Sequence, residues 1–491
     1  MSSYRMILVC VLLTISADKN NSQDNFQEWR NLQSKRFQDA QSGEDQQFSE
    51  FLRAEWEQFE AMEGSISDNT PKPAKTPVYK PDNAVENAVL KVITKKVELL
   101  NIDNPKSVKK EIIKNSTSIK VKNGRTISVS FQNEALSFTI DSSMPNHQQG
   151  AIDKWFVATY WENVTKTDYE PLITQLYDFR TQMKLNDWGY GILLKDVAVE
   201  IYGENSNLVH LFTWFMLLKS GYEAKVGLSS RDIVLLLPSS SELFGIPYYT
   251  FSDLNHKYYT IVFGEEGIDH NSSLSIYAGK YSNDGKLLDF SLSEIATTTP
   301  RFIKKTLEFK YKGNRYGVPI IVDENIANLY RHYPQTSIPT FFSATISPDV
   351  EVQLLHSLEK IIRNKSETEA VNLLLRFVQT AFKYQTDDEQ FGREKYLIPD
   401  ETLYYQICDC EDRSILFTQL VKRLTGLEVI GLDYPGHIAT AVSFSQPFPG
   451  DSIDHNGKQY VICDPTYINA DIGMSMPMYK NVNPRLIYLT K

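Results

Sequence analysis

Aromatic and aliphatic residues recur at helical spacing near the N-terminal end of the chain. Phe48, Leu52, Trp56 and Phe59 follow one another at intervals of four, four and three residues, which places them on one face of a helix. The pattern predicts an amphipathic helical arm over residues 18–68. Such an arm is either solvated, or it binds a partner or a second copy through its apolar face.

A stretch rich in proline and lysine follows the arm. Proline restricts the backbone and favours extended structure, so residues 69–83 are predicted to form a stiff linker. This linker is the clearest domain boundary in the sequence. Its prolines and lysines are Pro71, Lys72, Pro73, Lys75, Pro77, Lys80 and Pro81.

Beyond the linker, strand-like and helix-like patterns alternate. Residues 119–140 alternate between apolar and polar positions, which predicts a small β-rich element over 84–149. Leu208–Lys219 reads as an almost wholly apolar helix that stops before Gly221.

Alternation returns over residues 274–322, and residues 350–383 have helical periodicity. The chain is therefore predicted to be α+β, with several domains. After the β-rich element, the predicted units are 150–265, a β-rich spacer over 266–345, and 346–491.

Two of these units share a faint internal repeat. When the sequence is shifted by 205 residues, Phe212-Thr213 overlays Phe417-Thr418 and Gly221 overlays Gly426. Each copy reads as an apolar helix, a glycine stop and a short strand. Because few identities support the match, it indicates either a true repeat or a chance similarity.

The composition excludes several classes of protein. Hydrophobic residues make up 42% and charged residues 23% of the 491 residues, which is ordinary for a globular protein. A net charge of −10 argues against nucleic acid as a partner. Four cysteines are too few for a disulfide-rich scaffold. No zinc-ligand spacing and no phosphate-binding glycine loop is present, so no metal or organic cofactor is predicted.

The first residues have the pattern of an export signal. Met6–Ala17 is almost wholly apolar but too short to span a bilayer, so residues 1–17 are predicted to be a signal peptide. Cys10 raises the alternative of a lipoprotein, which the bulky Val9 before it fits poorly. No later apolar run reaches 18 residues, so no transmembrane span is predicted.

The chemistry-bearing residues lie near the C-terminal end. Cys410 opens a predicted helix that Gly426 ends, and a thiol at a helix N-terminus is favoured as thiolate. The charges of Glu411 and Asp412 oppose this effect, so a neighbouring imidazolium would have to outweigh them.

A base and an orienting carboxylate follow at equal intervals. His437 lies 27 residues after Cys410, just after a predicted turn, and Asp464 lies 27 residues further on, at the end of a predicted strand. Together they supply a nucleophile, a general base and a group that fixes the imidazole tautomer. We therefore predict a Cys410–His437–Asp464 triad.

These motifs resemble those of the transglutaminase-like superfamily of papain-type cysteine enzymes. The resemblance rests on Cys410-Glu411-Asp412, Gly436-His437 and Asp464-Pro-Thr-Tyr, with Cys408 where the family has glycine. It covers about residues 350–491 and, more weakly, 150–265. It implies a catalytic domain over 346–491, in which a cysteine-bearing helix packs on an antiparallel sheet, and it implies acyl-transfer chemistry.

The resemblance and the repeat together make residues 150–265 a predicted degenerate copy. Asn205 falls where Cys410 falls, and Asp232 falls near the position of His437. The first copy is therefore predicted to have lost the chemistry.

Two details of the site are left open by the sequence. The backbone N–H of Cys410 is one oxyanion donor, and Gln406 or a tyrosine, Tyr404 or Tyr405, is a second candidate. Cys408 and Cys463 each neighbour a triad residue, so an exported protein could link them by a disulfide. The competing interpretation is two free thiols, or a redox response between Cys408 and Cys410.

The sequence supports two functions. The first is an exported bacterial cysteine enzyme of the periplasm or cell envelope that acts on a protein or peptide amide through a thioester. Hydrolysis is favoured over transfer to an amine, because excluding water requires a dedicated tunnel. The second is a non-catalytic scaffold with a relic triad.

Overall fold

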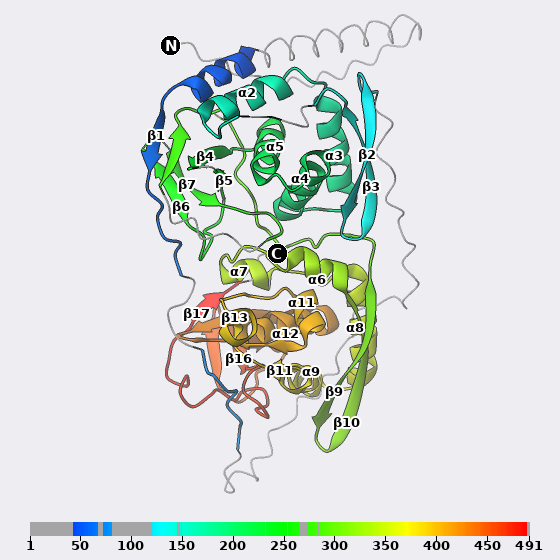
Figure 1. The fold of residues 1–491 in the computed structure, drawn as a ribbon. Coiled ribbons are helices and arrows are strands. Elements are labelled where there is room, and N and C mark those ends of the chain that lie inside the picture. The colour runs from blue at the N-terminus through cyan, green and yellow to red at the C-terminus, as the bar shows by residue number, and fades with distance from the viewer. Residues whose placement is uncertain are drawn as a thin grey trace, which may run out of the picture.

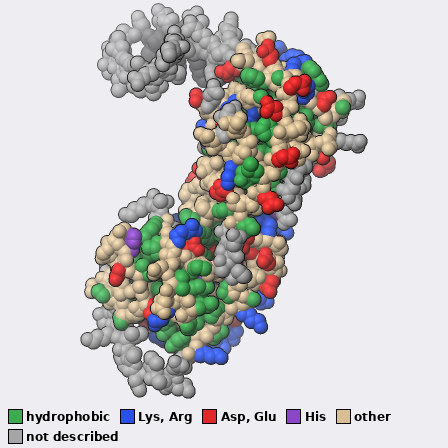
Figure 2. Space-filling model, turned by 90° about the vertical axis from the view of Figure 1, so that its left-hand side faces the viewer, with side chains coloured by type: hydrophobic (Ala, Val, Ile, Leu, Met, Phe, Trp, Pro, Cys, Tyr) green, Lys and Arg blue, Asp and Glu red, His purple; other side chains and the backbone are tan. Residues whose placement is uncertain are grey.

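The computed structural model describes residues 43–66, 72–80, 120–144, 148, 150–230, 232–252, 254–265, 273–282 and 284–488. The fold is mixed α+β, with several antiparallel sheets. Figures 1 and 2 show two lobes, one above the other. The predicted signal peptide, with Cys10, lies outside the described residues. Among the helices described, none is long and apolar enough to cross a membrane.

The upper lobe packs four helices against a six-stranded sheet (Figure 1). The helices are α2 (Lys154–Val164), α3 (Glu170–Gln182), α4 (Asp187–Tyr202) and α5 (Ser206–Lys219). The sheet has the order β1-β8-β4-β5-β7-β6. Its strands are β1 (Trp56–Phe59), β4 (Lys225–Ser229), β5 (Asp232–Pro238), β6 (Tyr248–Phe251), β7 (Leu254–Thr260) and β8 (Leu274–Tyr277).

The predicted helical arm is partly helical and is not solvated where it is described. Residues 43–53 form a helix whose Phe48 and Leu52 are buried in the upper-lobe core. The Phe48 ring packs on Trp161 at 4.8 Å. The prediction that Trp56 and Phe59 continue the helical face is wrong, because both lie in β1, which pairs antiparallel with β8.

Long hairpins flank each lobe. β2 (Gly124–Phe131) pairs with β3 (Glu134–Asp141), and β9 (Phe302–Tyr311) pairs with β10 (Asn314–Asp323). Of the predicted spacer over 266–345, β8 belongs to the upper sheet. The spacer also contains α6 (Glu324–Tyr330) and α7 (Ile338–Phe342), so it is not purely β-rich.

The lower lobe places α12 (Cys410–Thr425) against a five-stranded antiparallel sheet of order β15-β16-β14-β13-β17. The strands are β13 (Glu428–Tyr434), β14 (His437–Ser443), β15 (Ser452–His455), β16 (Lys458–Cys463) and β17 (Arg485–Ile487). The other helices are α8 (Pro348–Ile362), α9 (Glu367–Ala381), α10 (Asp387–Phe391) and α11 (Pro399–Tyr405). The short strands β11 (Lys383–Tyr384) and β12 (Ile407–Cys408) pair in parallel.

The two lobes share a strand topology. The order β6-β7-β5-β4-β8 in the upper sheet corresponds, strand for strand along the chain, to β15-β16-β14-β13-β17 in the lower sheet. One side-chain contact also recurs. His210 Nδ1 lies 2.6 Å from Ile233 O in the upper lobe, and Ser414 Oγ donates to Ile438 O at 3.1 Å in the lower lobe. The helix before each sheet is therefore anchored at the same point.

The described parts of the arm and the linker lie in different lobes. Residues 43–66 belong to the upper lobe, yet residues 72–80 run beside the lower lobe (Figure 1). Tyr79 N donates to Ile468 O at 2.8 Å, and Ile468 N donates to Pro77 O at 2.9 Å. Part of the predicted linker is thus packed on the lower lobe.

Candidate functional site

The first residue of α12 is Cys410. Its N-cap is Asp409, and its C-cap is Gly426 with a left-handed φ of 70°, which glycine adopts without steric cost. Lys422 and Arg423 lie in the last turn, where cations stabilise the helix. The apolar face is buried along the helix, so packing holds the thiol at a fixed position above the sheet.

A tight turn places His437. Tyr434 pairs with His437 across the hairpin of β13 and β14, so Pro435 and Gly436 occupy the two central turn positions. Gly436 has a φ of 71°, and proline followed by glycine is typical of a type II turn. The turn makes His437 the first residue of β14.

Asp464 is positioned by its own backbone neighbours. Its Oδ1 accepts hydrogen bonds from Thr466 N at 2.9 Å and Tyr467 N at 3.1 Å. Its Oδ2 lies 2.9 Å from His437 Nε2. The carboxylate therefore favours the tautomer that carries the proton on Nε2, which leaves Nδ1 as the basic nitrogen.

The other ring nitrogen of His437 is available for chemistry. Nδ1 is buried and has no hydrogen-bond partner among the described residues. The imidazole ring stacks on Tyr479, with centroids 5.1 Å apart and planes 17° apart. Ser414, one turn after Cys410, bonds the carbonyl of Ile438, so the start of α12 lies over the start of β14.

The Cys410 thiol is held by a neighbour other than His437. Its Sγ donates to Glu411 Oε2 at 2.9 Å. Burial, followed by the charges of Glu411 and Asp409, raises the pKa of the thiol well above its usual range, and Lys72 offsets this only in part. The expectation that the helix terminus favours the thiolate is therefore wrong for this arrangement. Burial first, and then the neighbouring carboxylates, favour the protonated thiol.

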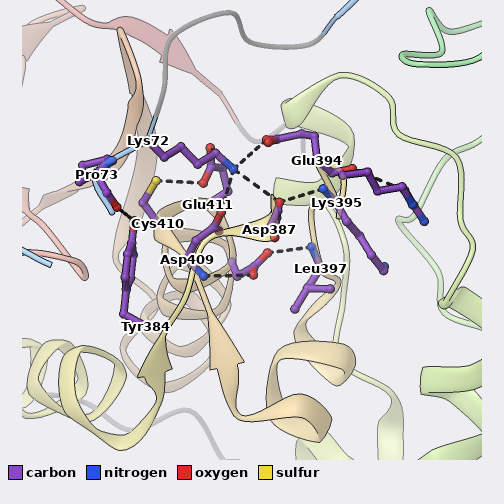
Figure 3. Close-up of polar contacts among 12 residues, drawn as sticks. Lys72, Pro73, Tyr384, Asp387, Glu394, Lys395, Leu397, Asp409, Cys410 and Glu411 are labelled. Carbon is purple, nitrogen blue, oxygen red and sulfur yellow. Dashed lines mark hydrogen bonds and ion pairs between the residues drawn. The ribbon is translucent and has the colours of Figure 1, made fainter. Parts of the chain in front are cut away.

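A lysine from the linker lies among these carboxylates (Figure 3). Lys72 Nζ is 2.7 Å from Asp409 Oδ2, 3.2 Å from Glu411 Oε1, 2.7 Å from Glu394 Oε1 and 3.5 Å from Asp387 Oδ2. We call these four residues the acidic cluster. The sequence does not reveal this role of Lys72, because a lysine in a proline-rich stretch carries no local signal for a distant site.

Three of the buried acids could hold a metal ion. Asp387, Asp409 and Asp412 each offer a carboxylate oxygen, and these oxygens lie within 4.8 Å of one another. Lys72 already bonds Asp387 and Asp409, and Leu397 N donates to Asp412 Oδ1 at 2.7 Å. The donor set would suit a hard cation, but an ammonium group already provides the positive charge.

The predicted side-chain oxyanion donors have other surroundings. Tyr405 packs against Phe391, with ring centroids 5.6 Å apart. Gln406 is the C-cap of α11, with a left-handed φ of 60°. A better-placed hydroxyl is that of Tyr384, which donates to Pro73 O at 2.7 Å and whose pKa is raised by burial and then by the Cys410 charge. Tyr384 lies in a two-residue strand, too short for a periodic signal.

The disulfide that the sequence left open between Cys408 and Cys463 is not formed, in line with the alternative of two free thiols. Both are buried free thiols. The Cys408 Sγ faces Lys383 O at 3.9 Å, and the Cys463 Sγ faces Val461 O at 3.5 Å. Both side chains belong to the hydrophobic core of the lower lobe. Cys408 is in an extended strand, so the glycine usual in the resembled family is not required there.

Comparison with known proteins adds no family. No protein-family model matches the chain, and no curated protein matches it. The function is therefore inferred from the site.

Proposed function

We propose that this protein is a cysteine enzyme that cleaves an amide of a protein or peptide through a thioester on Cys410. The observation that carries the proposal is the His437–Asp464 pair. An imidazole held at 2.9 Å by a carboxylate, with its other nitrogen buried and unpartnered among the described residues, has the arrangement of a general base.

The proposed reaction begins with a rotation of the Cys410 side chain away from Glu411. His437 Nδ1 then takes the thiol proton, and Sγ attacks the carbonyl carbon of the substrate. The imidazolium returns the proton to the leaving nitrogen as the C–N bond breaks. Water, deprotonated by His437, then attacks the thioester and releases the acid and the free thiol.

The negative oxygen of the tetrahedral intermediate needs donors. The backbone N–H of Cys410 is at a helix N-terminus, where N–H groups lack helical partners. The Tyr384 hydroxyl, which donates to Pro73 O, is the second donor in this proposal. Hydrolysis is favoured over transfer to an amine.

One observation favours the alternative, a non-catalytic scaffold with a relic triad. Cys410 is 0%, His437 1% and Asp464 3% exposed. A substrate can therefore reach the triad only after a rearrangement. In the enzyme proposal, the residues that cover the site move. In the scaffold proposal, they do not.

The rate at which iodoacetamide alkylates Cys410, measured between pH 6 and 8, separates the two. In the enzyme proposal the rate falls at least tenfold in His437→Gln, because the base that removes the thiol proton is lost. Cys408 and Cys463, followed by mass spectrometry of the same samples, are the internal controls and keep their rates. A Cys410 rate that is unchanged in His437→Gln would favour the scaffold.

A further inference from the structure

Residues 72–79 contact the candidate site at three places. The Lys72 ammonium lies in the acidic cluster. The Pro73 carbonyl accepts a hydrogen bond from the Tyr384 hydroxyl. The backbone of residues 77–79 pairs with Ile468 through two hydrogen bonds. A charged side chain, a carbonyl and a short β-ladder are the contacts by which extended peptides are recognised.

These contacts lie on both sides of the triad. Asp409 and Glu411, which hold Lys72, flank Cys410 in the sequence. Ile468 follows Asp464 by four residues in the same loop. The 72–79 segment therefore runs from the residues that flank the nucleophile to the loop that carries the orienting carboxylate, as a peptide substrate of the proposed enzyme would.

The acidic cluster is suited to a cation. The side chains of Lys72, Asp409 and Asp387 are 7%, 1% and 3% exposed. Asp409 Oδ1 is buried without a hydrogen-bond partner among the described residues. Burial, followed by the charge of Asp409, raises the pKa of Asp387 and of Glu411 well above the usual range. A buried carboxylate is costly unless an opposite charge is present, so a positively charged occupant stabilises the ionised cluster.

We propose that the acidic cluster is the site where the enzyme binds the ammonium group of a lysine-type side chain in an extended peptide substrate, and that residues 72–79 occupy this site intramolecularly. The inference rests on the proposed function, since it assigns the substrate class of that same site. Prolines keep the segment extended, and a tethered occupant competes at a high effective concentration.

The protonation state of Lys72 decides whether an amine in this site can act as an acyl acceptor. Burial alone would lower the pKa of Lys72, but the charges of Glu411, Asp409 and Asp387 outweigh burial and hold the pKa well above its usual value. A group that stays an ammonium ion has no lone pair with which to attack a thioester. With its Nζ 2.7 Å from both Asp409 Oδ2 and Glu394 Oε1, a side chain in this site is held as a cation, which suits recognition better than acyl transfer.

Calorimetric titration with synthetic peptides tests the inference on the full chain. The probe is acetyl-Lys-Pro-Ala-Lys-Thr-Pro-Val-Tyr-amide, which copies residues 72–79, and its control has norleucine in place of the first lysine. In Lys72→Met, which frees the cluster, we expect the lysine peptide to bind at least tenfold more tightly than the norleucine peptide. Lys75→Met changes an exposed residue of the same segment, and this variant should bind both peptides as wild type does.

Equal affinity of the two peptides for Lys72→Met, or binding of neither, would overturn the inference. Because Lys72→Met leaves buried carboxylates uncompensated, Tyr79→Pro provides a second test. It removes the N–H that donates to Ile468 O and leaves the cluster intact. We expect faster alkylation of Cys410 in Tyr79→Pro and its suppression by the lysine peptide alone. An unchanged rate would overturn the inference.

The outcomes separate this inference from the proposed function. Peptide binding is measured again in the double variant Lys72→Met, Cys410→Ser. Binding itself needs no nucleophile, so this variant tests the binding site alone. If binding depends on the lysine charge but the alkylation rate does not depend on His437, the binding site is supported and the enzyme proposal is contradicted. If the alkylation rate depends on His437 but binding does not depend on the lysine charge, the enzyme proposal is supported and the binding site is contradicted.

Discussion

Replacing Asp464 by asparagine tests the role of the carboxylate with little change in shape. Asparagine keeps an oxygen for the N–H groups of Thr466 and Tyr467, which Oδ1 now accepts at 2.9 and 3.1 Å. The amide NH₂ then faces His437 Nε2. Because Nε2 must accept from this NH₂, the ring proton moves to Nδ1, which can no longer take the thiol proton.

The expected loss follows from the wrong tautomer. A change of this kind in a triad costs roughly 10⁴-fold in rate, which corresponds to about 5.5 kcal/mol in the activation free energy. The backbone hydrogen bonds survive, so the melting temperature should stay close to that of wild type. The loss should therefore appear in acylation and not in folding.

The assay is the initial release of p-nitrophenolate from p-nitrophenyl acetate, with thermal unfolding of the same samples as the control for folding. Asp464→Ala, which also loses the backbone hydrogen bonds, should lose both activity and stability. If Asp464→Asn retains acylation within threefold of wild type, Asp464 does not set the tautomer, and the reasoning is refuted.

Three further predictions concern stability. Burial raises the pKa of Asp400 from 3.8 to about 7, so the folded state holds this proton more tightly than the unfolded chain does. The free energy of unfolding therefore falls by up to roughly 4 kcal/mol as pH rises from 4 to 7. Urea unfolding of Asp400→Asn at pH 5 and pH 8 should show a smaller difference than wild type, and an equal difference would contradict this. Phe48→Ala should cost about 3–5 kcal/mol and expose residues 43–53 to protease, unlike Gln47→Ala. Gly431→Ala should cost about 1–3 kcal/mol in urea unfolding, because its Cβ would lie 2.9 Å from Phe342; wild-type stability would show that the ring yields freely.

The parts of the lower lobe that the sequence predicts are those with local signals. The helix that begins at Cys410 has an apolar face and a glycine end, and the structure has it at Cys410–Thr425. The turn before His437 has proline and glycine where the φ angles require them. His437 and Asp464 are brought together because their strands, β14 and β16, are neighbours in the sheet.

The residues that the sequence could not reveal act over long distances or in short elements. Lys72 and Asp409 are separated by 337 positions, and nothing near either residue indicates the other. Tyr384 belongs to a strand of two residues. Trp56 and Phe59 have helical spacing, but pairing with β8 overrides it, as tertiary contacts often override local preference. The high pKa of the Cys410 thiol follows from burial, which only the folded structure shows.

The most direct test of the central claim is to look for the acyl-enzyme. The protein is mixed with p-nitrophenyl acetate, quenched in acid within seconds, digested and analysed by mass spectrometry. A working triad predicts an acetyl group on the Cys410 peptide of wild type, at least tenfold less of it in His437→Gln, and none on Cys408 or Cys463. Acetylation of Cys410 that is absent in wild type, or equal in wild type and His437→Gln, would contradict the triad.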